Sequence, residues 1–319
     1  MLHLRAITPK DRVEAVSAGL AEHPGVTNLV VLPDAAKRPA GDLVMCDVAR
    51  EAANEVIAGL RDLGIERDGS IALERVDLSI SDAAEHAELR APGYGEDAVV
   101  WAELDRRTLE ETTLTWSFVA FLTLATQLAG IAAIIDSPIL IVGAMVLGPE
   151  FGAVAAVSYG ILIGDVRRIA LALRTLVIGF AIAIAVTYLC ALISKWIGVI
   201  ELDELPAQRE LTGFIYNPDR WSFIVALLAG AAGVLSLTAG KSSALVGVFI
   251  SVTTVPAAGN LGVAVALRHW HEVGGSLLQL GVNLGGMVIA GTVTLLAQKA
   301  GWALVRKKGE RAVRGSSPG

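Results

Sequence analysis

The chain has 319 residues, 54% of them hydrophobic, and a mean hydropathy of +0.59, which excludes an ordinary soluble protein and favours a membrane protein. Residues 1–113 hold 12 basic and 22 acidic side chains (net −10), whereas residues 114–319 hold 14 and 10 (net +4). An acidic soluble part therefore precedes a membrane part, and its charge argues against nucleic acid as a partner.

Residues 1–78 alternate between strand and helix patterns. Strands are predicted over 2–8, 26–32, 42–48 and 71–78, with helices over 9–20 and 50–63 and a loop over 33–41. This βαββαβ order is the ferredoxin-like arrangement. Such a domain suits assembly or docking, and sensing of a small ligand is the alternative.

The rest of the chain divides into three parts. Residues 79–113 are predicted to be a linker with a juxtamembrane helix over 97–112, and 299–319 to be a basic tail. Between them, residues 114–298 hold six apolar segments long enough to cross a bilayer. They run over 114–135, 137–164, 168–195, 221–240, 243–267 and 275–298.

Basic residues predict the orientation of these segments. The side of the N-terminus carries Arg106, Arg107, Arg167, Arg168, Lys241 and the basic tail, whereas the opposite side carries the acidic loop 201–204. Positive loops stay in the cytoplasm, so both termini are expected there.

The segment 137–164 organises the membrane part, because it places Pro149 and the ionisable Glu150 within an apolar run. Proline breaks or kinks a helix, and a carboxyl at bilayer depth usually faces a partner or a water-filled cavity. A second copy of the pattern follows: Trp-Ser-Phe opens segments at 116 and at 221, and Pro256 takes the place of Pro149. Three segments per copy predict two inverted repeats with proline-broken helices, an arrangement typical of secondary transporters.

The segment Asp136-Ser-Pro-Ile-Leu-Ile-Val-Gly-Ala-Met-Val-Leu-Gly-Pro149, the pair Gly164-Asp165 and the run Ala229-Gly-Ala-Ala-Gly233 resemble a known family. It is the domain of unknown function 389, a family of uncharacterised prokaryotic membrane proteins, and the resemblance covers most of residues 114–298. It implies the inner membrane of a prokaryote but no substrate. The family usually continues after this proline with small or apolar residues, so the role of Glu150 is argued from its own chemistry.

Candidate site residues gather at the two prolines. A transport pathway is predicted from unwound backbone and polar side chains there, with Glu150 either titrating or remaining a protonated structural carboxyl. Ordinary hydrogen bonding between helices is the alternative for the neutral residues. The predicted pathway consists of Pro149, Glu150, Thr253, Thr254, Pro256, Asn260 and Asn283. Asp136 is assigned a structural role at a helix start, and Lys241 one at the membrane interface.

No motif of an enzyme is present: the sequence has no HExxH and no G-x-S-x-G, and its two cysteines, Cys46 and Cys190, form no cluster with histidine. No metal or cofactor is therefore expected. The sequence predicts a transporter or channel for a small solute or ion, with lipids around it and a homo-oligomeric assembly. The alternative is a non-transporting membrane scaffold or sensor.

Overall fold

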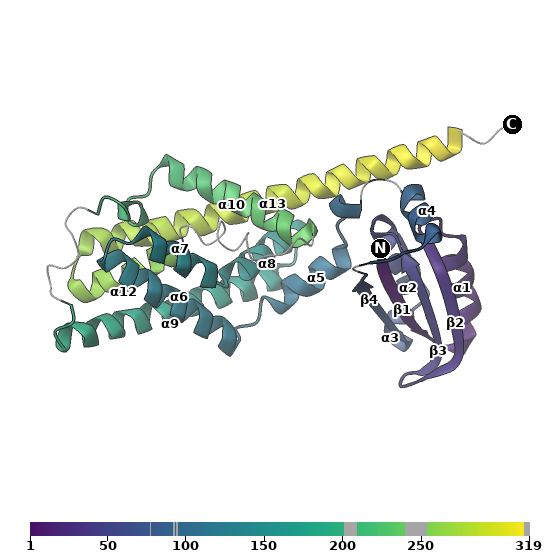
Figure 1. Ribbon diagram of the computed structural model, residues 1–319, viewed down its shortest axis with the longest axis horizontal. Coiled ribbons are helices and arrows are strands. Elements are labelled where there is room, and N and C mark those ends of the chain that lie inside the picture. Colours follow the sequence, from purple (N-terminus) through teal and green to yellow (C-terminus); the bar gives the residue numbers. More distant parts are fainter. Residues whose placement is uncertain (77, 92, 94, 201–208, 240–253, 316–319) are drawn as a thin grey trace. The chain divides into compact units, whose positions relative to one another are not determined.

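The computed structural model describes residues 1–315 except 77, 92, 94, 201–208 and 240–253 (Figure 1). The chain divides into two compact units. One contains Met1–Leu104 together with the residues from Ala300 onward, and the other contains Asp105–Lys299.

The first unit is built on a four-stranded antiparallel sheet with the order β2-β3-β1-β4. Alternate residues of β1, among them Leu4 and Ala6, are buried against Val16 of α1 and Val56 of α2. The strands are β1 (Leu2–Thr8), β2 (Val26–Lys37), β3 (Ala40–Val48) and β4 (Ser70–Arg75). The helices are η1 (Lys10–Arg12), α1 (Val13–Glu22), η2 (Arg50–Ala52), α2 (Ala53–Asp62), α3 (Ile65–Asp68), α4 (Asp82–Arg90) and η3 (Gly95–Asp97).

The loop predicted over 33–41 is largely strand, because β2 continues to Lys37. Pro33 is tolerated there since β2 lies at the edge of the sheet, where a missing N–H group breaks no ladder. The register shifts between Leu32 and Ala36, and the backbone N–H of Asp34 donates to the carboxylate of Asp42 at 2.9 Å. The predicted turn therefore shrinks to the two residues between Lys37 and Ala40.

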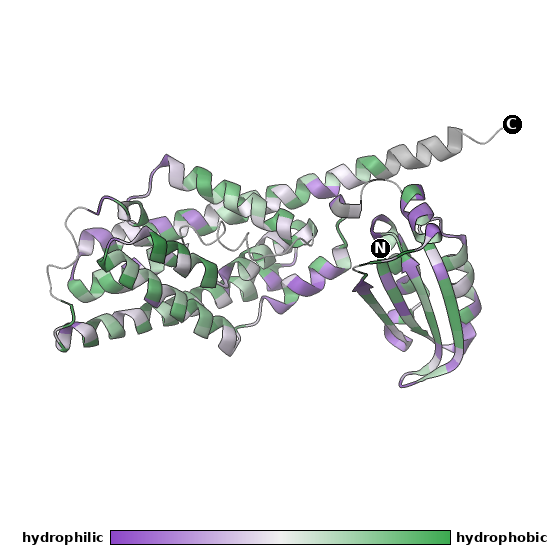
Figure 2. Cartoon of the chain, in the orientation of Figure 1, coloured by the Kyte–Doolittle hydropathy of each residue, from purple (hydrophilic) through white to green (hydrophobic). Residues whose placement is uncertain are grey.

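The second unit is helical. Its described elements, beginning with the helix that enters it, are α5 (Trp101–Glu110), α6 (Trp116–Ile134), α7 (Pro138–Leu147), α8 (Glu150–Ile163), α9 (Val166–Trp196), η4 (Gly213–Ile215), α10 (Arg220–Ala239), α12 (Thr254–Leu267) and α13 (Trp270–Gly315). Figure 2 shows hydrophobic residues along most of these helices.

Four of the described helices are long and apolar enough to cross a membrane: α6, α9, α10 and the Trp270–Val305 part of α13. The pair α7 and α8 counts as a fifth if it is one bent span. Of the predicted segment 243–267, only α12 lies within the described residues.

Two glycines bring helices of this unit into close contact. A Cβ atom on Gly230 of α10 would lie 2.5 Å from the carbonyl oxygen of Met287 on α13, and one on Gly259 of α12 would lie 2.6 Å from the carbonyl oxygen of Thr126 on α6. Small residues permit this backbone approach, which apolar association between helices in lipid requires. Every residue of α12 except Val265 is buried, so α12 lies in the core of the unit.

Candidate functional site

The site begins at the break between α7 and α8. α7 ends at Leu147, Gly148 and Pro149 are not helical, and α8 starts at Glu150 with a bend of 57° between the two helices. Proline has no N–H group to donate and its ring collides with the preceding turn, so a continuous helix cannot form here. The break predicted at Pro149 is confirmed.

Glu150 is the first residue of α8 and is fully buried. Its Oε1 atom accepts a 2.5 Å hydrogen bond from the hydroxyl of Thr254. Thr254, also fully buried, is the first residue of α12 as described, and Pro256 lies in the first turn of the same helix. The structure thus joins the residue after Pro149 to the residue two before Pro256.

Asn260, one and a half turns further along α12, belongs to a different polar cluster. Its Oδ1 atom accepts from Arg209 at 2.7 Å, and its Nδ2 donates to Ser276 at 2.9 Å and to Glu272 at 3.2 Å. Arg209 forms an ion pair with Glu272 and lies over the ring of Tyr216 at 4.5 Å. All four polar side chains of this Arg209–Glu272 cluster are buried.

Sequence reasoning missed the Arg209–Glu272 cluster. Arg209 and Glu272 lie 63 positions apart, in segments that were interpreted only as loops between spans. The available signal was Glu272, an acidic residue in the first turn of the long helix α13, because a charge buried among apolar residues is stable only when paired.

Asn283 lies on α13 together with Gln279, one turn before it, and both side chains are fully buried. Neither the amide nitrogen nor the carbonyl oxygen of either residue has a hydrogen-bond partner within the described part of the chain. Almost all buried polar groups in proteins are paired, with protein or with water. These two side chains therefore mark a place where another polar group is expected.

Asp136 does not cap the helix start, the role that the sequence assigned to it. The N-cap of α7 is Ser137, whose hydroxyl accepts from the N–H of Leu140 at 3.4 Å. Asp136 instead accepts from the hydroxyl of Thr212 at 2.6 Å and from its N–H at 2.9 Å. The Thr212 hydroxyl bond lowers the pKa of Asp136, followed by the backbone bonds from Leu211 and Thr212. Lys241 and Thr253 lie outside the described residues.

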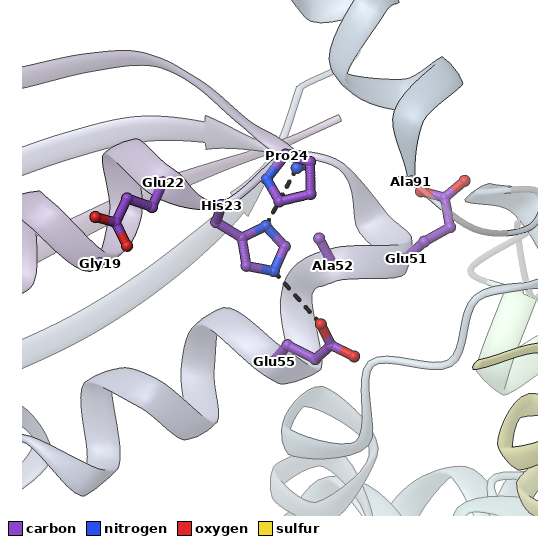
Figure 3. Close-up of a pocket in the computed structure, with 9 residues that line it drawn as sticks. Gly19, Glu22, His23, Pro24, Glu51, Ala52, Glu55 and Ala91 are labelled. Carbon is purple, nitrogen blue, oxygen red and sulfur yellow. Dashed lines mark hydrogen bonds and ion pairs between the residues drawn. The ribbon is translucent and has the colours of Figure 1, made fainter. Parts of the chain in front are cut away.

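The first unit has a pocket of its own, about 360 Å³ in volume (Figure 3). Figure 3 shows the ring of His23 within it, whose Nδ1 accepts from the N–H of Gly25 at 3.1 Å and whose Nε2 lies 3.5 Å from Glu55. Burial raises the pKa of Glu51, which also lines the pocket. The full lining is Gly19, Glu22, His23, Pro24, Gly25, Glu51, Ala52, Glu55 and Ala91. Within the described residues, no group of three or more His, Cys, Asp or Glu is arranged to hold a metal ion.

The apolar helices and the buried polar groups between them define a multi-pass membrane protein. Residues 145–289 match the family model described as Domain of unknown function (DUF389), which confirms the resemblance stated above. This stretch contains Glu150, Thr254, Asn260 and Asn283.

The chain is also similar to a curated protein. An uncharacterized protein of Methanocaldococcus jannaschii, MJ0678, is 27% identical over 159 residues, which are 48% of this chain and 47% of that protein. The match thus spans about half of the relative's length. No solved structure matches the chain.

Proposed function

We propose that this protein is a transporter or channel for a small solute or ion, with its pathway at the contact between Glu150 and Thr254. The observation that supports this most is a fully buried carboxyl at the start of a broken helix, hydrogen-bonded to the start of α12. Ionisable side chains within membrane segments are costly and usually mark an ion or substrate path. Broken helices whose ends meet are where secondary transporters bind their cargo.

The described helices also support the finer architecture that this proposal implies. The first half consists of α6, the bent pair α7–α8 and α9, and the second of α10, α12 and α13. The sequence Trp-Ser-Phe forms the first three residues of α6 and follows the first residue of α10. We propose six spans in two inverted three-helix repeats, with the fifth span formed by the segment that contains α12 and the sixth by α13.

For the soluble part we propose a ferredoxin-like domain that regulates or assembles the membrane part. The strand order β2-β3-β1-β4 and the βαββαβ sequence of its main elements support this fold. β2 is an edge strand, and its Val30 and Leu32 are 43% and 42% exposed. Exposed apolar edge strands favour pairing with a second copy, so a homo-oligomer is expected and deletion of residues 1–78 should weaken it.

A sensor role for the soluble domain is the second candidate. The pocket around His23 and Glu55 supports it, since a cavity of this volume accommodates a small molecule. In this alternative the membrane part is an anchor and oligomer core. The sensor role would be favoured if the Glu150→Gln variant, described below, had the same flux as the wild type.

The test is ion and solute flux in proteoliposomes, measured with dyes for protons, sodium and potassium and by osmotic swelling for neutral solutes. Glu150→Gln keeps the size and hydrogen-bonding capacity of the side chain but removes its ability to ionise. We expect the flux of the variant to stop or to lose its pH dependence. Glu210→Gln, at an exposed position of the same unit, is the matched control. Unchanged flux and pH response in Glu150→Gln, with folding intact, would contradict the proposal.

A further inference from the structure

One face of α13 is polar and buried. Glu272, Ser276, Gln279 and Asn283 follow one another at intervals of four, three and four residues, which places them on the same side of a helix. Glu272 is 7% exposed and the other three are not exposed. In a unit whose buried residues are otherwise mostly apolar, this polar face runs for about three turns, or roughly 16 Å at 1.5 Å per residue.

The polar face of α13 reaches the level of Glu150. α12 ends at Leu267 and α13 begins at Trp270, so the two form a tight helical hairpin that is pinned by the hydrogen bond from Asn260 to Ser276. Thr254 lies six residues before Asn260, and Asn283 lies seven residues after Ser276. With a rise of 1.5 Å per residue, Thr254 lies about 9 Å and Asn283 about 10.5 Å from that hydrogen bond, in the same direction along the hairpin. Asn283 and the Thr254–Glu150 contact therefore lie at the same height.

The two ends of this polar face differ in how they are paired. Glu272 and Ser276 are hydrogen-bonded within the Arg209–Glu272 cluster. Gln279 and Asn283 leave both of their amide groups without a partner in the described residues. A buried amide without hydrogen bonds destabilises the folded state unless water or a ligand supplies those hydrogen bonds. The unpaired end is the one at the height of Glu150.

We propose that Gln279 and Asn283, together with Thr254 and Glu150, bind a small monovalent cation, and that this cation is the cargo or the coupling ion of the pathway. The assignment rests on the proposed transport function for its role, but the binding itself can be measured without transport. The site offers two amide oxygens, a hydroxyl oxygen and a carboxylate, and oxygen atoms are the ligands of hard cations.

The composition of the site argues for the charge of the ligand. An anion at this height would approach the carboxylate of Glu150, and the buried cation Arg209 is already paired with Glu272. Dedicated protein sites for calcium usually contain several carboxylates, and the four residues of this site include one, that of Glu150. A single carboxylate with neutral oxygens balances one positive charge.

The experiment is a thermal unfolding titration of the full-length protein in detergent, with lithium, sodium or potassium chloride against choline chloride at equal ionic strength. We expect at least one of the small cations to raise the unfolding temperature in a saturable manner, and choline not to. Asn283→Leu and Gln279→Leu should weaken the apparent affinity at least tenfold. Gln298→Leu removes an amide of the same helix that already donates to Thr238 at 2.8 Å, and should keep the cation effect.

Asn283→Asp covers the case in which a leucine variant fails to fold, because it keeps the size and adds a carboxylate, and it should change which cation stabilises best. Identical unfolding temperatures in all four salts, or an unchanged cation effect in both leucine variants, would overturn the site. Its failure is distinguishable from failure of the proposed function. If flux depends on Glu150 but no cation raises the unfolding temperature, only the cation site is rejected. If a cation raises the unfolding temperature but no flux is detected, only the transport function is rejected.

Discussion

The hydroxyl of Thr254 donates a 2.5 Å hydrogen bond to the carboxyl of Glu150, which lies 104 positions earlier in the chain. Both residues are fully buried, and each is the first residue of its helix as described. The N-terminal end of a helix carries partial positive charge, so both ends favour an oxygen-rich partner there. This contact joins the neighbourhoods of Pro149 and Pro256.

Replacing Thr254 by valine keeps the shape of the side chain and removes the donor to Glu150. We expect the free energy of unfolding to fall by about 1–3 kcal/mol, because a buried acceptor loses a partner. Thr254→Ser retains the hydroxyl and should stay closer to the wild type. Unfolding titrations in mixed micelles measure the difference, and equal stability of the two variants would show that the hydrogen bond is unimportant.

The ion pair of Arg209 and Glu272 should behave as a buried unit. Removing either partner leaves the other charge buried and is expected to cost about 3–5 kcal/mol. The double variant Arg209→Met with Glu272→Leu should cost less than the sum of the single variants, since no charge is then left unpaired. The same unfolding titration gives this double-mutant cycle, and additive losses would contradict the pairing.

Gly230 should tolerate no side chain, whereas Gly281 should. A Cβ atom on Gly230 would lie 2.5 Å from the backbone of Met287, and no heavy atom lies within 4 Å of a Cβ on Gly281. We expect Gly230→Ala to destabilise the protein by about 1–3 kcal/mol through forced separation of α10 and α13. Gly281→Ala should be neutral or stabilising. If both alanine variants unfold at the wild-type temperature, the close approach of α10 and α13 is wrong.

The first unit should lose stability as the pH rises from acid to neutral, because of Glu51. Burial, the largest cause, raises its pKa above the ordinary 4.5. The folded form therefore holds the proton of Glu51 more tightly than the unfolded form. The resulting contribution of Glu51 to the free energy of unfolding is full below pH 4.5 and is lost as the pH rises through the pKa of the folded form. Glu51→Gln should remove this loss. Hydrogen-exchange protection of β1 and α2, measured at several pH values, tests it. The control is Glu14→Gln on α1, which should retain the wild-type pH dependence of protection.

Thiol labelling should report the proposed orientation. Burial raises the pKa of Cys46 to about 12, so this thiol stays protonated and unreactive. In a Cys190→Ala background, Asn217→Cys should react with an impermeant reagent added to intact cells, and Arg167→Cys only after the membrane is opened. Both introduced positions are exposed. The reverse labelling pattern would mean that the termini face outward.

Local sequence determined much of the architecture. Alternation of apolar residues gave the four strands, and the apolar runs gave α6, α9, α10 and α13, because both signals depend on neighbours within a few residues. The break before Glu150 follows from a proline in the interior of an apolar run, since its ring collides with the preceding turn of a helix there. The extension of β2 past Pro33 did not follow, because only its place at the sheet edge makes that proline tolerable.

The candidate site was likewise only partly predictable from the sequence. The sequence indicated Glu150, Thr254, Asn260 and Asn283 as polar exceptions in apolar segments. It could not show that Glu150 meets Thr254, or that Asn260 is engaged by Arg209 instead. Those choices depend on which helices pack together and at what height. The tertiary structure alone decides them, because a polar side chain within a membrane unit must be satisfied by whatever the packing of distant helices brings beside it.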